Sequence, residues 1–260
     1  MWIVIRTARA VPRILPATLA CNFACALLVF GAVAAAAQTA SAQGTGPAQD
    51  ELLPAKTYYV VTRIDPRMCP SPLCGGVYVK QVNRTRTRCA DGSVANDCYV
   101  PILDWSSLSL SDEEIRQVED DFRQMHLIAR GELRIVDSPF GPLPGLVAMD
   151  AWRGVTGNEP ISLVYGLRPS GIVCITTPCP EFDAVRLNQD KHRLIHAVDL
   201  TASGADAEQI SKGLVALYQG PGLLVAGPRT RIRGPAGKGI EIVVSEFYTT
   251  VDSSPVSSAP

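Results

Sequence analysis

The sequence predicts an α+β fold built by tandem duplication, in which each repeat is an antiparallel sheet with one helix and disulfide-stapled loops. A C-x4-C pair occurs twice, as Cys69 and Cys74 and again as Cys174 and Cys179. Each pair lies between two apolar runs of the kind that form strands. One amphipathic segment with a helix-start signal follows in each half. Matching elements in the same order indicate an internal repeat.

Segments other than the cysteine motifs also match between the halves. The first half carries extra residues in its middle, and Cys89 and Cys98 enclose them. An insertion closed by its own cysteine pair keeps its two ends together, so we expect this segment to project as a loop from the shared fold. The matching segments are 61–66 with 164–169, 102–104 with 197–199, 127–131 with 223–227, and 146–152 with 242–248.

Strands are expected on both sides of the helix in each half, because β-branched and aromatic residues are concentrated there. Strands in a run around one helix imply an antiparallel sheet with the helix on one face. A single short helix cannot cover both faces, so we expect the other repeat to cover the second face, as a symmetric dimer would. The expected strands include 57–64, 76–82, 99–104, 127–136 and 146–152, and then 194–199, 223–232 and 240–250.

Both helices are expected to start at a capping box. The Ser111 hydroxyl can accept a first-turn N–H while Glu114 reaches back to the Ser111 N–H. Asp206 and Gln209 offer the same arrangement in the second half, and the Gly-Pro-Gly sequence at 220–222 ends that helix. The apolar stripes are Ile115, Val118 and Phe122 in the first helix and Ile210, Leu214 and Leu217 in the second.

Residues 1–42 have the composition of a secretory signal peptide. Arginines precede a long uncharged apolar run, and Ala40-Ser41-Ala42 is a small-x-small site with cleavage expected before Gln43. The run approaches the ~20 residues that span a membrane, so a retained anchor is the alternative. Cys21 is a faint lipoprotein signal, because most of the apolar run follows it. No membrane span is expected after cleavage.

The mature chain is expected to contain two folded repeats with polar ends. Residues 43–56 and 252–260 are rich in glycine, proline and serine, which predicts a flexible linker and a disordered tail. The repeats are then 57–154 and 161–251. The formal net charge is −1, and no basic run follows the signal, so nucleic acid is not an expected partner.

Six cysteines remain after signal removal, an even number in an exported chain. Spacing favours three local disulfide bonds, although six cysteines allow fifteen pairings. An oxidising compartment makes disulfides the default. The alternative is a four-sulfur zinc site shared by the repeats. The expected bonds join Cys69 with Cys74, Cys89 with Cys98, and Cys174 with Cys179.

A few acidic residues are candidates for catalysis. Asp104 matches Asp199 in the alignment of the halves, and Asp150 matches Glu246. Paired carboxylates can perform acid–base chemistry. However, Asp104 and Asp199 each end a strand just before a helix, where an aspartate commonly holds a turn. No nucleophile elbow, zinc-protease helix or phosphate loop is present. We therefore assign no catalytic residue.

The histidines give no pattern for a metal site. His192 and His196 have the spacing of metal ligands on a helix, but their segment has the composition of a strand. In a strand the two rings would lie roughly 13 Å apart along the chain. We expect these residues and His126 to be surface histidines, and we expect no metal and no cofactor.

Four motifs resemble those of a known family. They are the Tyr-x-Val-Thr segment at 59–62, Cys-Pro-x-Pro-x-Cys-Gly-Gly at 69–76, Thr-Arg-Cys-Ala-Asp-Gly at 87–92 and Cys-Ile-Thr-Thr-Pro-Cys-Pro at 174–180. With them the chain is similar to a family of uncharacterised exported bacterial domains, a domain of unknown function, over most of residues 57–251. The resemblance implies an exported bacterial protein and no catalytic residues.

These observations favour a binding protein over an enzyme. We expect a non-enzymatic binding or structural module of the bacterial envelope or extracellular space, located in the periplasm, at the cell surface or in the medium. Its expected partner is an unknown macromolecule, because stiff disulfide loops lose little entropy on binding. Two alternatives stay open: a protease-inhibitor-like loop presenter, and a secreted hydrolase that uses the paired carboxylates.

Overall fold

The computed structural model describes residues 57–160 and 162–251. We call residues 57–154 the first half and residues 162–251 the second half. The expected signal peptide, linker and tail lie outside the described residues. The first half contains β1 (Thr57–Ile64), β2 (Val77–Gln81), β3 (Thr87–Arg88), β4 (Val94–Ala95), β5 (Cys98–Val100), β6 (Ile102–Asp104), a 3-10 turn (Ser106–Leu108), α1 (Asp112–Arg123), β7 (Leu127–Val136) and β8 (Leu143–Gly154). The second half contains β9 (Val164–Pro169), β10 (Phe182–Arg186), β11 (His192–Ile195), β12 (Ala197–Asp199), a 3-10 turn (Thr201–Ser203), α2 (Ala207–Gln219), β13 (Leu223–Ala226), β14 (Arg229–Gly234), β15 (Gly237–Val243) and β16 (Glu246–Thr250).

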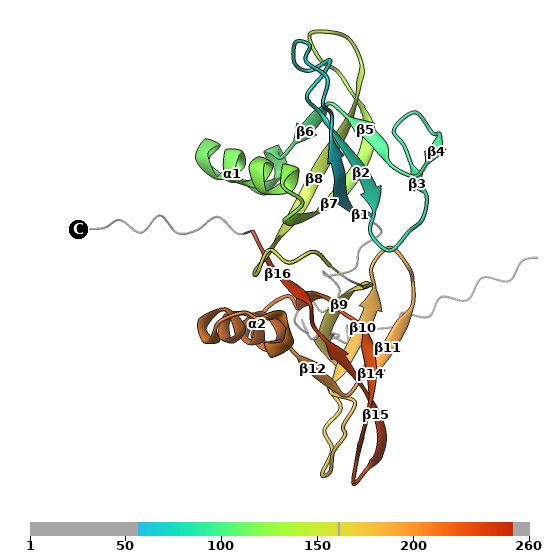
Figure 1. Cartoon of the computed structure of the whole chain (residues 1–260), viewed down its shortest axis with the longest axis vertical. Coiled ribbons are helices and arrows are strands. Elements are labelled where there is room, and N and C mark those ends of the chain that lie inside the picture. Colours follow the sequence, from blue (N-terminus) through green and yellow to red (C-terminus); the bar gives the residue numbers. More distant parts are fainter. Residues whose placement is uncertain (1–56, 161, 252–260) are drawn as a thin grey trace, which may run out of the picture. The chain divides into compact units, whose positions relative to one another are not determined.

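The fold is α+β, as the sequence predicts: a mostly antiparallel sheet carries one helix in each half (Figure 1). The strand order of the main sheet is β11-β10-β9-β13-β16-β8-β7-β1-β2-β5. Two pairs depart from the expected antiparallel pattern, because β6 runs parallel to β8 and β12 runs parallel to β15. The smaller sheets are β12-β15-β14 and β3-β4.

Each half packs its helix against a core of its own. Val118 and Phe122 of α1 are buried in the first core, where the Phe122 ring meets Trp105 edge-on at 5.3 Å between centroids. Leu217 of α2 is buried in the second core. A third cluster draws on both halves and includes Tyr58 and Leu224. The halves therefore share apolar contacts as well as one sheet.

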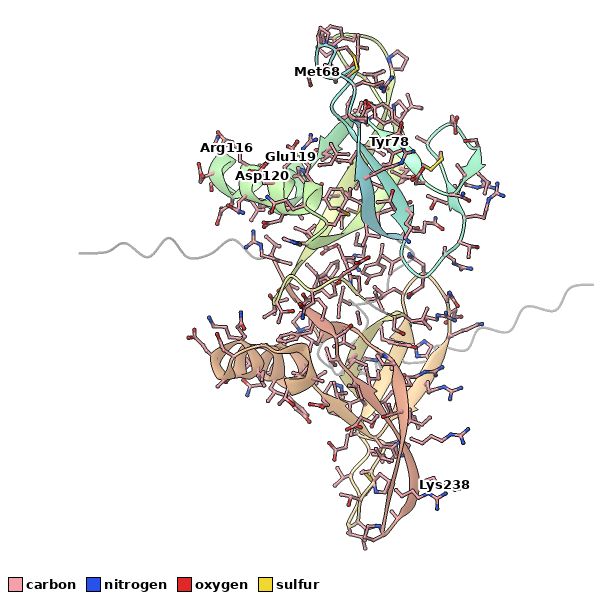
Figure 2. The ribbon with its side chains drawn as sticks, in the orientation of Figure 1. Met68, Tyr78, Arg116, Glu119, Asp120 and Lys238 are labelled. Atoms are coloured by element: carbon pink, nitrogen blue, oxygen red, sulfur yellow. A yellow bond between two sulfur atoms is a disulfide. The ribbon has the colours of Figure 1, made fainter. Side chains whose placement is uncertain are left out.

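Both helices start as the sequence predicts. The Ser111 hydroxyl accepts from the Glu114 N–H, and the Glu114 carboxylate accepts from the Ser111 N–H at 2.9 Å. Asp206 and Gln209 form the same reciprocal pair, at 2.8 and 2.9 Å. On α1, Arg116, Glu119 and Asp120 form part of the polar surface of the helix (Figure 2).

The buried stripe of α2 differs from the expected one. Leu214 is 41% exposed, and the residue that meets the sheet is Gly213. A Cβ atom on Gly213 would lie 2.8 Å from the Phe247 ring. The large Phe247 side chain therefore leaves space only for a glycine at this helix position. The first half has the opposite combination, with Val118 on α1 and Ala151 on the sheet.

The halves are joined edge to edge through the last strand of each. In the pairing of β8 with β16, Trp152 lies opposite Thr250, and Gly154 lies opposite Tyr248. Two asparagines with left-handed backbone, Asn83 (φ 60°) and Asn188 (φ 57°), bridge the halves elsewhere. The Asn83 amide binds the backbone of Val164 at 2.7 and 2.9 Å. The Asn188 amide accepts from the Tyr58 N–H and donates to the Tyr58 carbonyl, both at 2.8 Å.

Several expected strands are divided in two. The segment 99–104 changes partner at Pro101, with β5 beside β2 and β6 beside β8. The segment 223–232 breaks after β13, where Pro228 has no N–H to donate. The segment 240–250 breaks between β15 and β16, and 194–199 breaks at His196 between β11 and β12. In each case the two parts of the segment pair with different strands. The local periodicity of the sequence does not show where such a change of partner occurs.

The alignment of 61–66 with 164–169 is wrong by two to three residues. In the strand register, Tyr59 lies opposite Gln81, and Tyr165 lies opposite Arg186, a pairing that this alignment does not follow. A β-bulge in β1 between Val61 and Arg63 inserts one residue into the first half. A bulge shifts the register without a change in composition, so the alignment by apolar and proline positions missed it.

Candidate functional site

The first cysteine loop, residues 65–76, projects after β1. The Asp65 N–H donates to the Gly76 carbonyl at 2.9 Å and closes the loop at its base. Cys69 and Cys74 are joined by a disulfide bond. The Arg123 guanidinium of α1 donates to the Gly75 carbonyl at 2.7 Å. The loop backbone is thus held both by itself and by the neighbouring helix.

An ion pair orders the entry to this loop. The Arg67 guanidinium donates to both carboxylate oxygens of Asp65, at 2.9–3.0 Å, and the Arg67 backbone N–H adds a further bond at 3.1 Å. The hydrogen bonds from Arg67 hold the pKa of the Asp65 carboxyl well below its usual range. The charged form of Asp65 therefore supports the loop at neutral pH.

The second cysteine loop, residues 170–181, is closed in the same way. The Ser170 N–H donates to the Glu181 carbonyl at 2.7 Å, and Cys174 and Cys179 form a disulfide bond. The loop packs against the β14–β15 hairpin, where the Ala236 N–H donates to the Thr177 carbonyl at 2.8 Å. This loop is consequently fixed at its base, at its disulfide and against the neighbouring hairpin.

Both cysteine loops expose apolar side chains to solvent. Met68 and Ile175 are fully exposed, and Val173 is 94% exposed. Figure 2 shows Met68 at the outer end of its loop. Large apolar groups are expensive to leave in water, at about 25 cal/mol per Å². Both loops therefore present large apolar side chains on backbones that a disulfide bond and hydrogen bonds hold in place.

The third disulfide bond joins Cys89 with Cys98 and has a different setting. Cys98 is buried, and both cysteines contact the first core. The Cys89 N–H donates to the Ser93 carbonyl at 2.9 Å, which closes the β3–β4 hairpin. This bond anchors the β3–β4 hairpin to the core. The hairpin has no large apolar side chain that is fully exposed.

Two of the four candidate acids hold turns. One carboxylate oxygen of Asp104 accepts from the Ser106 N–H at 3.0 Å and from its hydroxyl at 2.6 Å. Asp199 makes the same two bonds to Thr201, at 3.0 and 2.6 Å. The hydroxyl of Ser106 lowers the pKa of Asp104. Both carboxylates therefore serve the turn that precedes the helix.

The other two acids are also engaged. Asp150 forms an ion pair with Arg130, with 2.7 Å between Oδ2 and Nε. Glu246 is buried and accepts the backbone N–H groups of Val155, Thr156 and Asn158 at 2.8–3.1 Å. It holds the segment that connects the halves. The sequence matched Glu246 with Asp150 but gave no sign of this role.

His192 and His196 do not lie on one strand, in contrast to the expectation from the sequence. His192 lies on β11 and contacts Asp183 at 3.1 Å. His196 follows the end of β11, and its Nδ1 accepts the Ile240 N–H at 3.1 Å. The third, His126, is exposed and follows α1. Among the described residues, no group of three or more His, Cys, Asp and Glu side chains has an arrangement that could hold a metal ion.

Each half contains a cavity. One has a volume of about 400 Å³ and includes Tyr59, Arg88 and Glu132 in its lining. The other has about 320 Å³ and includes Tyr165 and three arginines. None of the four candidate acids lines either cavity. Neither cavity could be predicted from the sequence, because both form between strands that are distant in the chain.

A family model described as Domain of unknown function (DUF6748) matches residues 58–254. This match confirms the resemblance to a domain of unknown function that the motifs indicated. No curated protein and no solved structure matches the chain. Within the described residues, no helix has the length and apolar character needed to cross a membrane.

Proposed function

We propose that this chain, which belongs to the DUF6748 domain family, is an exported protein that binds another protein through its two cysteine loops. The observation that carries the proposal is the exposure of Met68, Val173 and Ile175 on loops closed by disulfide bonds. Burying such side chains against a partner removes apolar area from water. Because the loops are already ordered, little conformational entropy is lost on binding.

The state of the acids supports binding over hydrolysis. A glycoside hydrolase needs two carboxylates that flank the substrate, one of them free to give or take a proton. The carboxylates of Asp104 and Asp199 accept hydrogen bonds within turns. Asp150 forms an ion pair with Arg130, and Glu246 accepts backbone N–H groups. We therefore propose that the protein is not an enzyme of this class.

Export is the second part of the proposal. Disulfide bonds persist in oxidising compartments, and three are present in the described residues. They agree with a signal peptide at 1–42, which we propose is removed before Gln43. The intact mass of the protein from envelope or medium tests this point, and a mass that includes the apolar run would contradict it.

Tandem duplication is the third part, with copies at 57–154 and 161–251. The strand order of the main sheet supports it, because β5-β2-β1-β7-β8 on one side corresponds to β11-β10-β9-β13-β16 on the other. Gly131 and Gly227 support it as well. A Cβ on either would lie 2.1 Å from a carbonyl oxygen, that of Val147 or Val243, at matching strand positions. Asn83 and Asn188 make equivalent bonds across the junction.

The binding proposal is tested by capture with matched variants. The exported protein is immobilised and exposed to the envelope and medium fractions of its own culture. A variant with Met68, Val173 and Ile175 changed to serine should lose a bound protein that the native chain retains. The control changes Met125, Val94 and Val215, which are 47–53% exposed outside the loops, to serine and should retain it.

The outcomes separate the alternatives. A captured protease whose activity falls on binding would assign the inhibitor form of the proposal. Identical capture by the loop variant and the control would show that the loops are only structural and would refute the proposal. Hydrolysis of a glycan by the native chain, lost on changing Asp150 or Glu246 to a neutral residue in a folded variant, would favour the hydrolase.

A further inference from the structure

The cavity of the second half has a concentration of positive charge. Its volume is about 320 Å³, and its lining includes Arg193 of β11 and Arg229 and Arg231 of β14. Arg229 also lies over the ring of Tyr165, with 5.9 Å between the guanidinium carbon and the ring centroid. Three arginine residues from two strands therefore line one small cavity.

The nearby carboxylates do not neutralise these arginines. Asp183 pairs with Arg168 and with His192, both at 3.1 Å. Glu241 lies opposite Thr230 in the register and accepts its hydroxyl at 3.3 Å. Thr230 also lines the cavity, whereas Glu241 does not. Within the described chain, none of the three cavity arginines forms an ion pair.

The first half shows that the fold does not need arginine at these positions. In the pairing of β7 with β8, Leu133 lies opposite Leu146 and Ile135 lies two residues further on. Arg229 and Arg231 occupy the corresponding positions of β14, opposite Ile242 and Ile240. The corresponding cavity includes Leu133 in its lining and has a similar volume of about 400 Å³. The arginines thus replace apolar residues at equivalent places in a similar sheet.

We propose that the cavity of the second half binds a small ligand through an oxyanion group of the phosphate or sulfate type. Planar guanidinium groups donate two parallel hydrogen bonds to such groups, and three unpaired guanidinium groups suit a multiply charged anion. The volume lies at the small end of ligand pockets, roughly 300–1,000 Å³. No residue of either cysteine loop lines the cavity, so its test is independent of the proposed protein partner.

Further cations continue from the cavity along the same hairpin. Arg233 follows Arg231 on the same face of β14, and it lies opposite Lys238 in the register. Figure 2 shows Lys238 on the β14–β15 hairpin. The phosphate or sulfate group could therefore belong to a free small molecule or to the end of a longer acidic chain. Titration with free phosphate or sulfate and with a sulfated polysaccharide distinguishes these two sources.

The test is a nuclear magnetic resonance titration of the whole exported protein. Inorganic phosphate and sulfate are added in separate arms, chloride at equal ionic strength is the blank, and a sulfated polysaccharide forms a further arm. Saturable shifts should appear in the signals of Arg193, Arg229 and Arg231. The variant R229Q/R231Q should bind at least about tenfold more weakly.

The control variant R116Q/K212Q removes the same number of positive charges from the two helices. Arg116 and Lys212 pair with Glu113 and Glu208 and are distant in sequence from the hairpin. This variant should bind like the native chain. Phosphate or sulfate binding alone assigns a small ligand, and tighter binding of the polymer assigns a longer one. Equal shifts with chloride, or unchanged binding by a folded R229Q/R231Q, would overturn the proposal.

Discussion

Gly213 and Phe247 pack against each other, so we expect substitutions at these two positions to be strongly coupled in their effect on stability. A Cβ on Gly213 would lie 2.8 Å from one ring carbon of Phe247, 3.3 Å from another and 3.4 Å from Leu200. The change Gly213→Val should therefore overpack the core and destabilise the protein by about 1–3 kcal/mol. The change Phe247→Ala should leave a cavity at a fully buried site and cost about 3–5 kcal/mol.

The double variant should be more stable than the sum of the two changes implies. It recreates in the second half the combination of Val118 and Ala151 found in the first core. The valine fills part of the space that the phenylalanine vacates, so we expect a coupling of about 2 kcal/mol, within the range for residues in contact. Urea unfolding followed by circular dichroism, with disulfides intact, measures all four proteins. Strictly additive free energies of unfolding would refute the reasoning.

Three further predictions concern the junction and the ion pairs. The change Glu246→Gln places an amide donor against backbone N–H groups. It should lower the free energy of unfolding, measured in urea, by about 3 kcal/mol. A loss below 0.5 kcal/mol, on the order of a surface substitution, would contradict the role assigned to Glu246. The change Asn83→Ala removes two hydrogen bonds to Val164 and strains a left-handed residue. It should lower the free energy of unfolding by about 2–3 kcal/mol, whereas Asn83→Gly should lower it by less. Equal losses of stability would show that backbone strain is unimportant. Three carboxyl groups have a pKa below the usual range: Asp65, bonded to Arg67; Asp97, bonded to Arg63; and Asp104, bonded to Ser106. Their stabilisation is present above an unfolded-state pKa of about 4 and is lost as the pH falls below it. The urea midpoint should therefore be flat from about pH 7 to 5 and then decline, and a rise in stability below about pH 4 would contradict the sign.

Local signals in the sequence predicted the helices well. A capping box depends on residues three apart, so Ser111 with Glu114 and Asp206 with Gln209 could be identified directly. The burial of Gly213 in place of Leu214 could not be predicted, because it depends on Phe247, a residue on a distant strand. Local periodicity describes one face of a helix but not the shape of the surface that it meets.

Strand limits were predicted less well, because they depend on partners. The composition of 223–232 is typical of a strand throughout, yet β13 and β14 belong to different sheets. Gly227 and Pro228 mark the break, but Gly131, which has the same close approach to a carbonyl oxygen as Gly227, lies within the continuous strand β7. The roles of Asn83 and Asn188 were missed for the same reason. Their partners lie more than eighty residues away.

The candidate surface was predicted in part. The sequence indicated two stiff cysteine loops, and apolar residues beside the cysteines are visible in it. That Met68 and Ile175 are fully exposed, while Leu167 and Leu187 are buried, follows only from the assembled sheet. The arginine cavity was not predicted, because Arg193 and Arg229 come together only when β11 lies near the β14–β15 hairpin.

The central claim, that the cysteine loops contact a protein partner, is tested most directly by site-specific photo-crosslinking in living cells. The photoreactive residue benzoylphenylalanine is placed at position 68 or 175, with position 215 on α2 as the control. We expect one adduct of defined mass from both loop positions, or a distinct adduct from each, and none from position 215. Absence of adducts at both loops in correctly exported protein, or the same adducts from position 215, would contradict it.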